Sequence, residues 1–161
     1  MEGAALKCVN GRFAMIGIEA AQEIDAAQTM ELSSDQPQCQ YIRSGQTYSR
    51  LTVKAPHGSG TATDTAVDTG HGELTLTDLP ARDDVQAGRW ARALLLGCNR
   101  MCETLTMSTE FNPGLTAMAR VNVEGAPETA GAWIVQEVWH DLYNLTSRVR
   151  MHRCIDTVES R

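Results

Sequence analysis

The hydrophobic and polar residues of this chain alternate over much of its length with the two-residue period of a β-strand. Residues 48–55 show the pattern well, because Leu51 and Val53 fall on one face with polar residues on the other. Further strand-like segments lie at residues 11–18, 73–77, 104–109, 117–123, 133–140 and 145–155. Because successive strands joined by short turns pair antiparallel, the pattern predicts a mainly β fold of the α+β type, either an antiparallel β-barrel or a sandwich-like domain.

One segment, residues 83–101, has the period of an amphipathic helix instead. Asp83 suits its N-terminal end, and Gln86 three residues later completes the pattern of a capping box. We expect this central helix to bury one face against the predicted sheet. Apolar residues at steps of three and four define that face: Ala87, Trp90, Ala91, Leu94, Cys98 and Met101.

The remaining segments define the predicted domain boundaries. Residues 19–30 are rich in alanine and favour a helix, and residues 33–40 are polar with a proline, as in a linker. Residues 56–72 have the Gly, Ser, Thr and Asp content of a long mobile loop. We therefore divide the chain into an N-terminal strand and helix segment or appendage, residues 1–40, and a β-rich domain, residues 41–161, that contains the helix.

Composition and charge argue against several classes of function. With 161 residues, of which 42% are hydrophobic and 21% charged, the chain has the make-up of one folded globular domain. The net charge of -6 and the lack of clustered basic and aromatic residues argue against a nucleic-acid partner. We expect neither a membrane segment nor a signal peptide, because no sufficiently apolar run is present. Five scattered cysteines then indicate reduced thiols and a cytosolic origin.

The residues that could carry chemistry do not form a recognisable catalytic motif. The sequence has no Gly-x-Ser-x-Gly elbow, no phosphate-binding loop, no His-Glu-x-x-His and no Cys-x-x-Cys. We therefore predict no enzyme activity, no catalytic residue and no cofactor. An alternative is a hydrolase in which His140 acts as a base that Asp141 orients. His57 and His71 stand beside glycines and are interpreted as loop residues.

A zinc-stabilised binding module is a second alternative. Cys98 and Cys102 are one helical turn apart, while His152 and Cys154 share a strand face. These four side chains would make a tetrahedral zinc site if the last strand crosses the end of the helix. Because a cysteine on a buried helix face is also explained as a small apolar residue, our main prediction contains no metal.

Three residues of the strand at 133–140 are candidates for a protein interface. Trp133, Val135 and Trp139 are separated by even numbers of residues, so the strand period predicts that they share one face. Tryptophan is enriched among the residues that dominate binding energy in protein interfaces. If one of them is exposed, that face becomes the candidate interface.

Three stretches of the chain carry a resemblance to a known family. They are Gly-Arg-Trp-Ala-Arg-Ala at 88–93, Phe-Asn-Pro-Gly-Leu at 111–115 followed by Val-Asn-Val-Glu-Gly at 121–125, and Trp-Ile-Val-Gln-Glu-Val-Trp-His-Asp at 133–141. Together with the order of elements, they resemble the C-terminal part of phage tail hub proteins, which include the late control protein D family and the Mu-type baseplate hub. The likeness covers about two-thirds of the chain.

The resemblance implies a structural subunit of a phage tail or baseplate. Residues 41–161 would be the hub-like domain of a ring, usually trimeric, at the junction of tail tube and spike. Its partners would be other tail and baseplate proteins and further copies of itself, and it would be assembled in the bacterial host cytoplasm and reside in the virion. The family's tube-like N-terminal portion has no evident counterpart in residues 1–40. The sequence leaves open the stoichiometry and the identity of the neighbouring subunits.

Overall fold

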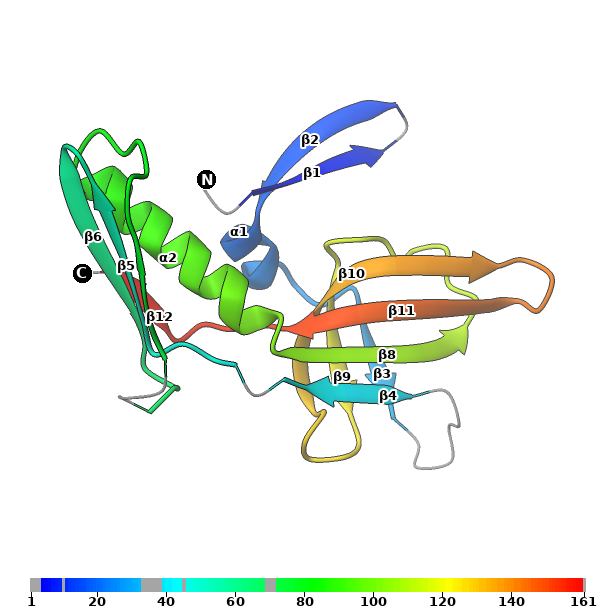
Figure 1. Ribbon diagram of the computed structural model, residues 1–161. Helices are drawn as coiled ribbons and strands as arrows, with labels where there is room; N and C mark the ends of the chain where they lie inside the picture. Colours follow the sequence, from blue (N-terminus) through cyan, green and yellow to red (C-terminus); the bar gives the residue numbers. More distant parts are fainter. Residues whose placement is uncertain (1–3, 10, 33–38, 45, 69–71, 161) are drawn as a thin grey trace. The chain divides into compact units, whose positions relative to one another are not determined.

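The chain folds into two compact units (Figure 1). The first, here called the helix unit, contains Ser44–Cys102, Ile155–Arg161 and Met1–Ala4. The second, the sheet unit, contains Ala5–Arg43 and Glu103–Cys154. The computed structural model describes residues 4–9, 11–32, 39–44, 46–68 and 72–160.

Strands dominate both units, so the predicted mainly β class is confirmed. The helix unit has a sheet of order β12-β6-β5-β7 and the helix α2. Its elements are β5 (Arg50–Ala55), β6 (Gly58–Asp64), β7 (Glu73–Leu76), α2 (Asp84–Arg100) and β12 (Val158–Ser160). The sheet unit has a sheet of order β3-β9-β10-β11-β8-β4. Its strands are β3 (Gln28–Glu31), β4 (Gln40–Arg43), β8 (Glu103–Glu110), β9 (Arg120–Glu124), β10 (Gly131–Asp141) and β11 (Thr146–Arg153).

Both of these sheets are mixed, which corrects the expectation of purely antiparallel pairing. Strands β5 and β7 pair in parallel, and so do β3 and β9, because in each case other segments carry the chain back before the second strand begins. The neighbours joined by short turns, such as β5 with β6 and β10 with β11, are antiparallel as predicted. Among the described residues each sheet ends in edge strands, and no closed barrel is formed.

The predicted central helix is confirmed as α2. The Asp83 carboxylate accepts a hydrogen bond of 2.7 Å from the Gln86 backbone N–H, and the Gln86 side chain accepts one of 2.9 Å from the Arg82 backbone N–H. These bonds satisfy amide groups that a helix leaves unpaired at its N-terminal end. The helix contacts β5, β6 and β12, so it covers the sheet of its own unit.

The buried face of α2 agrees only in part with the predicted one, because Ala87 and Ala91 are fully buried but the four larger predicted residues are not. Trp90, Leu94 and Cys98 are only partly buried, and Met101 lies beyond the helix with 38% of its surface exposed. The face that packs on the sheet is rotated and combines three small residues with two leucines and an asparagine: Ala87, Gly88, Ala91, Leu95, Leu96 and Asn99. The apolar pattern misplaced this face because it counted large side chains, whereas close packing on β6 requires small ones.

Strand β6 lies within the segment for which the sequence predicted a loop, residues 56–72, so that prediction is wrong over residues 58–64. A Cβ atom added to Gly60 would lie 2.1 Å from the Gly88 nitrogen, and one added to Gly58 would lie 2.5 Å from the Asp83 carbonyl carbon. Glycine therefore lets the helix backbone rest directly on the strand. The polar, glycine-rich composition that suggests a loop belongs here to a strand on which a helix packs closely.

A buried polar network fixes the C-terminal end of α2. The Asn99 side chain, 3% exposed, accepts a hydrogen bond from the Tyr48 backbone N–H and donates to the Tyr48 carbonyl, both at 2.8 Å. It also donates to the Asp64 carboxylate at 2.7 Å, and the Thr157 hydroxyl donates to the same carboxylate at 2.6 Å. The network thus links the helix, the end of β6 and the segment before β12.

The sheet unit has its own apolar core on one face of its large sheet. Val121 and Val123 of β9 lie in it, but the strand predicted over residues 117–123 begins only at Arg120, and Ala117 lies in an exposed turn. The predicted last strand is confirmed over β11, but Leu145 belongs to the preceding turn and Ile155 lies beyond the strand. The core cluster comprises Met30, Leu105, Met107, Leu115, Val121, Val123, Trp133, Val135, Val149 and Met151.

The N-terminal region contains more strand than the sequence predicted. Strands β1 (Ala4–Val9) and β2 (Arg12–Gly17) form a separate two-stranded sheet, followed by the short helix α1 (Ile18–Glu23). The predicted helix over 19–30 is therefore only partly correct, because Gln28–Glu31 pairs with β9 instead. Most of the expected linker at 33–40 lies outside the described residues. The division of the chain into residues 1–40 and 41–161 stays a prediction. No helix in the described part of the chain is long and apolar enough to cross a membrane.

Candidate interaction surface

A β-bulge in β10 separates the three predicted interface residues. Val135 pairs with Met151 and Glu137 pairs with Arg150, so Gln136 is an extra residue that shifts the register by one. Such a shift exchanges the two faces of a strand. Before the bulge Trp133 and Val135 face the core, and after it Val138 does. The prediction that Trp133 and Trp139 share a face is therefore wrong.

Trp133 is an internal anchor of the sheet unit. Its ring is fully buried, and its indole N–H donates a hydrogen bond of 2.8 Å to the Thr129 carbonyl. The Arg153 guanidinium lies 4.5 Å from the ring centre, within cation–π distance, and is itself paired with Glu103. The edge of Tyr41 contacts the same ring. Within this chain, Trp133 and Val135 therefore have no surface to offer to a partner.

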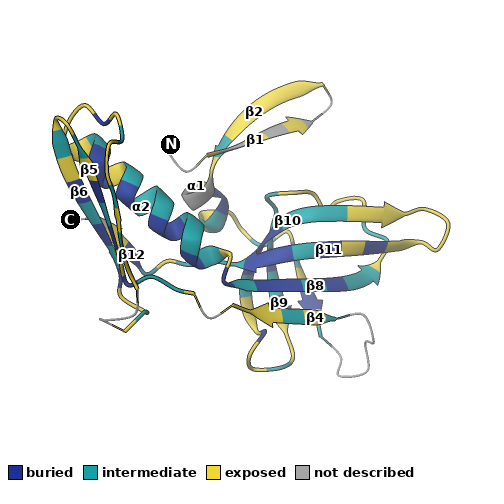
Figure 2. Ribbon diagram, viewed as in Figure 1, coloured by how far each residue is buried: buried dark blue, intermediate teal, exposed yellow. Residues whose placement is uncertain are grey.

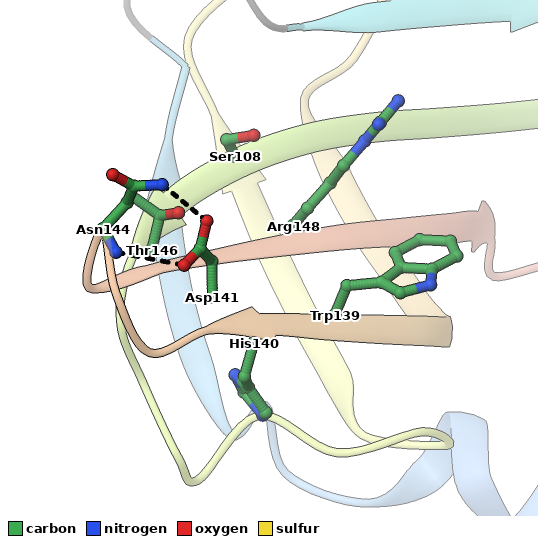
Figure 3. A pocket seen from close by; sticks show the side chains of 7 residues that line it. All are labelled: Ser108, Trp139, His140, Asp141, Asn144, Thr146 and Arg148. Atoms are coloured by element: carbon green, nitrogen blue, oxygen red, sulfur yellow. Dashed lines mark hydrogen bonds between the residues drawn. The ribbon is translucent and has the colours of Figure 1, made fainter.

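Trp139 is 50% exposed and lies on the opposite face of the sheet (Figure 3). It is cross-strand to Arg148, which is in turn opposite Ser108, so these three residues form one row across β10, β11 and β8. Nearer the end of the hairpin, Asp141, Thr146 and Glu110 form the next row on the same face. Of the predicted candidates, Trp139 alone retains the exposure that an interface requires.

The tip of the β10–β11 hairpin exposes further apolar side chains that the sequence analysis overlooked. Leu142 is 71% exposed, Tyr143 95% and Leu145 63%, and all three lie in the turn between the strands (Figure 2). A turn made of Leu, Tyr, Asn and Leu is unusually apolar, which is the signal that could have identified them. With Trp139 they make four exposed apolar residues within positions 139–145, at the end of the hairpin.

Asp141 holds this turn together. Its carboxylate accepts hydrogen bonds of 3.0 Å from the backbone N–H groups of Tyr143 and Asn144, and one of 2.6 Å from the Asn144 side chain. The bonds from the Asn144 backbone and side chain, followed by the one from Tyr143, lower the pKa of Asp141. The carboxylate is thus ionised and engaged within the turn, in the role that aspartate commonly has at the start of a turn.

His140 and Asp141 do not form a base and its orienting acid. Figure 3 shows the two side chains projecting from opposite sides of the hairpin, as adjacent strand residues do. His140 Nδ1 lies 2.9 Å from the Ser147 hydroxyl, and its ring packs edge-on against Phe111. Ser147 is fully buried and its hydroxyl accepts a hydrogen bond from the Asn112 N–H, so it is not presented as a nucleophile. The arrangement joins two turns of the unit and does not assemble a hydrolase site.

An open cavity of about 500 Å³ lies along this part of the hairpin. Polar and charged side chains line most of it, with the Trp139 ring as its main apolar element. Open, mixed surfaces of this kind suit contact with another macromolecule better than enclosure of a small substrate. The lining residues are Ser108, Trp139, His140, Asp141, Asn144, Thr146 and Arg148.

The four residues of the zinc alternative are divided between the units. Cys98 and Cys102 belong to the helix unit, whereas His152 and Cys154 belong to the sheet unit. Burial, and then the neighbouring Cys102, raise the pKa of the Cys98 thiol, which opposes the thiolate form that zinc binds. In the part of the chain that is described, no group of three or more metal-ligating side chains is placed to hold an ion. The zinc site stays a prediction that elemental analysis would test.

The two loop histidines of the sequence analysis have separate outcomes. His57 lies exposed in the short turn between β5 and β6, so the region around it is a hairpin turn and not part of a long loop. His71 lies outside the described residues.

A second exposed apolar surface lies on the β1–β2 hairpin. Leu6 is 68% exposed, Phe13 73% and Met15 77%, and the Cys8 thiol is also exposed (Figure 2). Leu6 and Cys8 share one face of β1, and Phe13 and Met15 share one face of β2. The sequence analysis treated this region as an appendage and proposed no interface in it.

The chain has the fold of known proteins, but its sequence matches no known family. No family model matches the chain, and no curated protein matches it. Solved structures of phage tail and virion proteins have the same fold over most of the chain. All three share less than 15% identity with it, so they establish a likeness of fold alone.

The particular structures are the following. The 43 kDa tail protein of prophage MuSo2 from Shewanella oneidensis has a TM-score of 0.74 and 12% identity, over 94% of this chain and 50% of that one. The tail protein from Neisseria meningitidis MC58 has a TM-score of 0.61 and 11% identity, over 81% and 45%. A chain in the virion of a native gene transfer agent particle has a TM-score of 0.56 and 14% identity, over 80% and 32%. The chain thus spans half or less of the length of each.

Proposed function

We propose that this chain is a structural assembly component of a phage tail or a related particle. It is a hub-like subunit at the junction of tail tube and spike, it acts by packing against other tail proteins and further copies of itself, and it is not an enzyme. It is assembled in the bacterial host cytoplasm and resides in the virion. A ring of subunits, usually trimeric, is the arrangement that the resemblance to hub proteins implies.

The observation that carries this proposal is the exposure of large apolar side chains on two hairpins of a fold that tail and virion proteins share. Trp139, Leu142, Tyr143 and Leu145 lie at the end of one hairpin, and Leu6, Phe13 and Met15 lie on the other. Contiguous apolar surface on a folded protein marks a site of protein interaction. Aromatic residues among them supply the large contact areas that anchor such interfaces.

The arrangement of polar groups supports packing over catalysis. Asp141 and His140 are each engaged in bonds that fix turns of the sheet unit, and they point away from each other. The cavity beside them is open. A subunit that functions by packing against its neighbours requires surface turns that are held in place in this way.

Self-association is the first measurable consequence. We expect the chain at rising concentration to shift from monomer to a defined oligomer in size-exclusion chromatography with light scattering. Cross-linking in tail particles of the source phage would then place it beside tube and spike proteins. A monomer at all concentrations, together with absence from purified particles, would contradict the proposal.

A further inference from the structure

The sheet unit presents two distinct apolar surfaces. The hairpin patch consists of Leu6, Phe13 and Met15 on β1 and β2, and the tip patch consists of Trp139, Leu142, Tyr143 and Leu145 at the end of β10 and β11. All of these side chains are at least half exposed. Both patches belong to the sheet unit, so one folded unit presents both of them to a partner.

The hairpin patch needs a partner for its own stability. The strands β1 and β2 form a sheet of only two strands, which is marginally stable at best in water. Burial of an exposed Leu, Phe or Met side chain is favourable, because it removes apolar surface from water. In the described part of the two strands, nearly every side chain is exposed. A surface that covers this hairpin would therefore stabilise it substantially.

The charges near the two patches are complementary. Residues 4–17 include basic residues and no acidic one, and Arg12 is exposed on β2. Beside the tip patch, Glu110 and Asp141 lie in one row across the hairpin, and both are exposed. Arg148 lies one row farther from the tip, so the acidic pair is the outermost charge. An apolar and basic surface and an apolar and acidic surface thus occur on one chain.

We propose that the hairpin patch of one copy of this chain packs on the tip patch of a second copy. The inference rests on the proposed function, because it names the partner of the exposed Trp139 surface. Contact between two tip patches would bring acidic rows together, and contact between two hairpin patches would bring Arg12 side chains together. Only contact between a hairpin patch and a tip patch brings unlike charges together. Such a head-to-tail contact generates a ring where the rotation closes.

The native thiol of Cys8 on β1 allows a direct test. A tagged wild-type chain is mixed with an untagged chain that carries Cys8→Ser and Tyr143→Cys, and a short bismaleimide is added. We expect a covalent adduct between the tagged and untagged chains, with Cys8 joined to position 143 in peptide mass spectrometry. The matched control replaces Tyr143→Cys by Val85→Cys, because Val85 is 71% exposed but lies on α2, outside both patches.

The outcomes separate the inference from the function on which it rests. An adduct at position 143, with little at position 85, supports the head-to-tail contact. Oligomers in light scattering without that adduct would overturn the inference and leave the assembly role standing. A chain that never associates with itself would overturn the inference, and only its absence from purified particles as well would contradict the proposed function.

Charge exchange gives a second readout that does not depend on thiol chemistry. Arg12→Glu is expected to weaken association several-fold, and adding Glu110→Arg to the same chain is expected to restore it. Both residues are exposed, so neither change should prevent folding. Loss of association in the single variant without recovery in the double variant would argue against the pairing of these surfaces.

Discussion

The side-chain amide of Asn99 donates a hydrogen bond of 2.7 Å to the Asp64 carboxylate inside the helix unit, where both residues are almost fully buried. An apolar replacement of Asn99 would leave this carboxylate and the Tyr48 backbone groups short of partners. We expect Asn99→Leu to lower the free energy of unfolding by about 3 kcal/mol in urea denaturation. Val85→Ala on the exposed side of the same helix should change it by less than about 0.5 kcal/mol.

Gly60 and Gly97 should respond in opposite directions to alanine. A Cβ at Gly60 would lie 2.1 Å from the Gly88 nitrogen, so Gly60→Ala forces α2 away from the sheet and should destabilise the chain by about 3 kcal/mol or more. Nothing lies within 4 Å of a Cβ at Gly97, in α2, and Gly97→Ala should stabilise by about 0.5–1 kcal/mol. Thermal unfolding of the two variants shows whether each substitution raises or lowers the melting temperature. Equal melting temperatures would refute the close helix–strand contact.

Trp133 and Trp139 offer a matched pair for separating fold from assembly. Trp133→Ala removes a fully buried ring and should cost about 3–5 kcal/mol of stability. Trp139→Ala removes a half-exposed ring and should alter stability by less than about 1 kcal/mol while weakening association. Chemical denaturation and light scattering on the same samples distinguish the two effects. A strong loss of stability in Trp139→Ala would place that ring inside the core, against the assignment made above.

The turn at Asp141 predicts a pH dependence with a defined sign. Hydrogen bonds from Asn144 and then Tyr143 lower the pKa of Asp141 below its ordinary value of 3.8. Their contribution to the turn is therefore complete above that pH and is lost as the pH falls through the lowered value. Carboxyl carbon shifts in an NMR titration should report the low pKa. Asn144→Ala removes the side-chain donor and should raise that pKa toward 3.8, whereas Leu142→Ala should leave it unchanged.

Much of the fold can be predicted from local pattern. The caps and length of α2 depend on residues within one turn of each end, and strands such as β5 and β11 show their buried face through alternation. The Asp141 turn is also local, because its bonds reach no farther than Asn144. Because these features depend on neighbours in sequence, local pattern is enough to predict them.

The candidate surface could be predicted only in part. Trp139 was identified, but its grouping with Trp133 failed because the bulge at Gln136 reverses the strand faces, and a bulge of this kind leaves no clear mark in the alternation. The exposed residues of β1 and β2 were missed for a different reason. An alternating pattern does not reveal that Leu6, Phe13 and Met15 remain exposed.

By itself, the sequence determined which segments are extended or helical and where they turn, because those choices are made by propensity, capping and alternation over a few residues. Only the tertiary structure decided which face of α2 is buried, why residues 58–64 form a strand, and which apolar side chains remain exposed. These outcomes depend on distances between residues far apart in the chain, such as Gly60 and Gly88 or Asn99 and Asp64. Packing at such close range selects for small and polar residues that a hydrophobic pattern does not count.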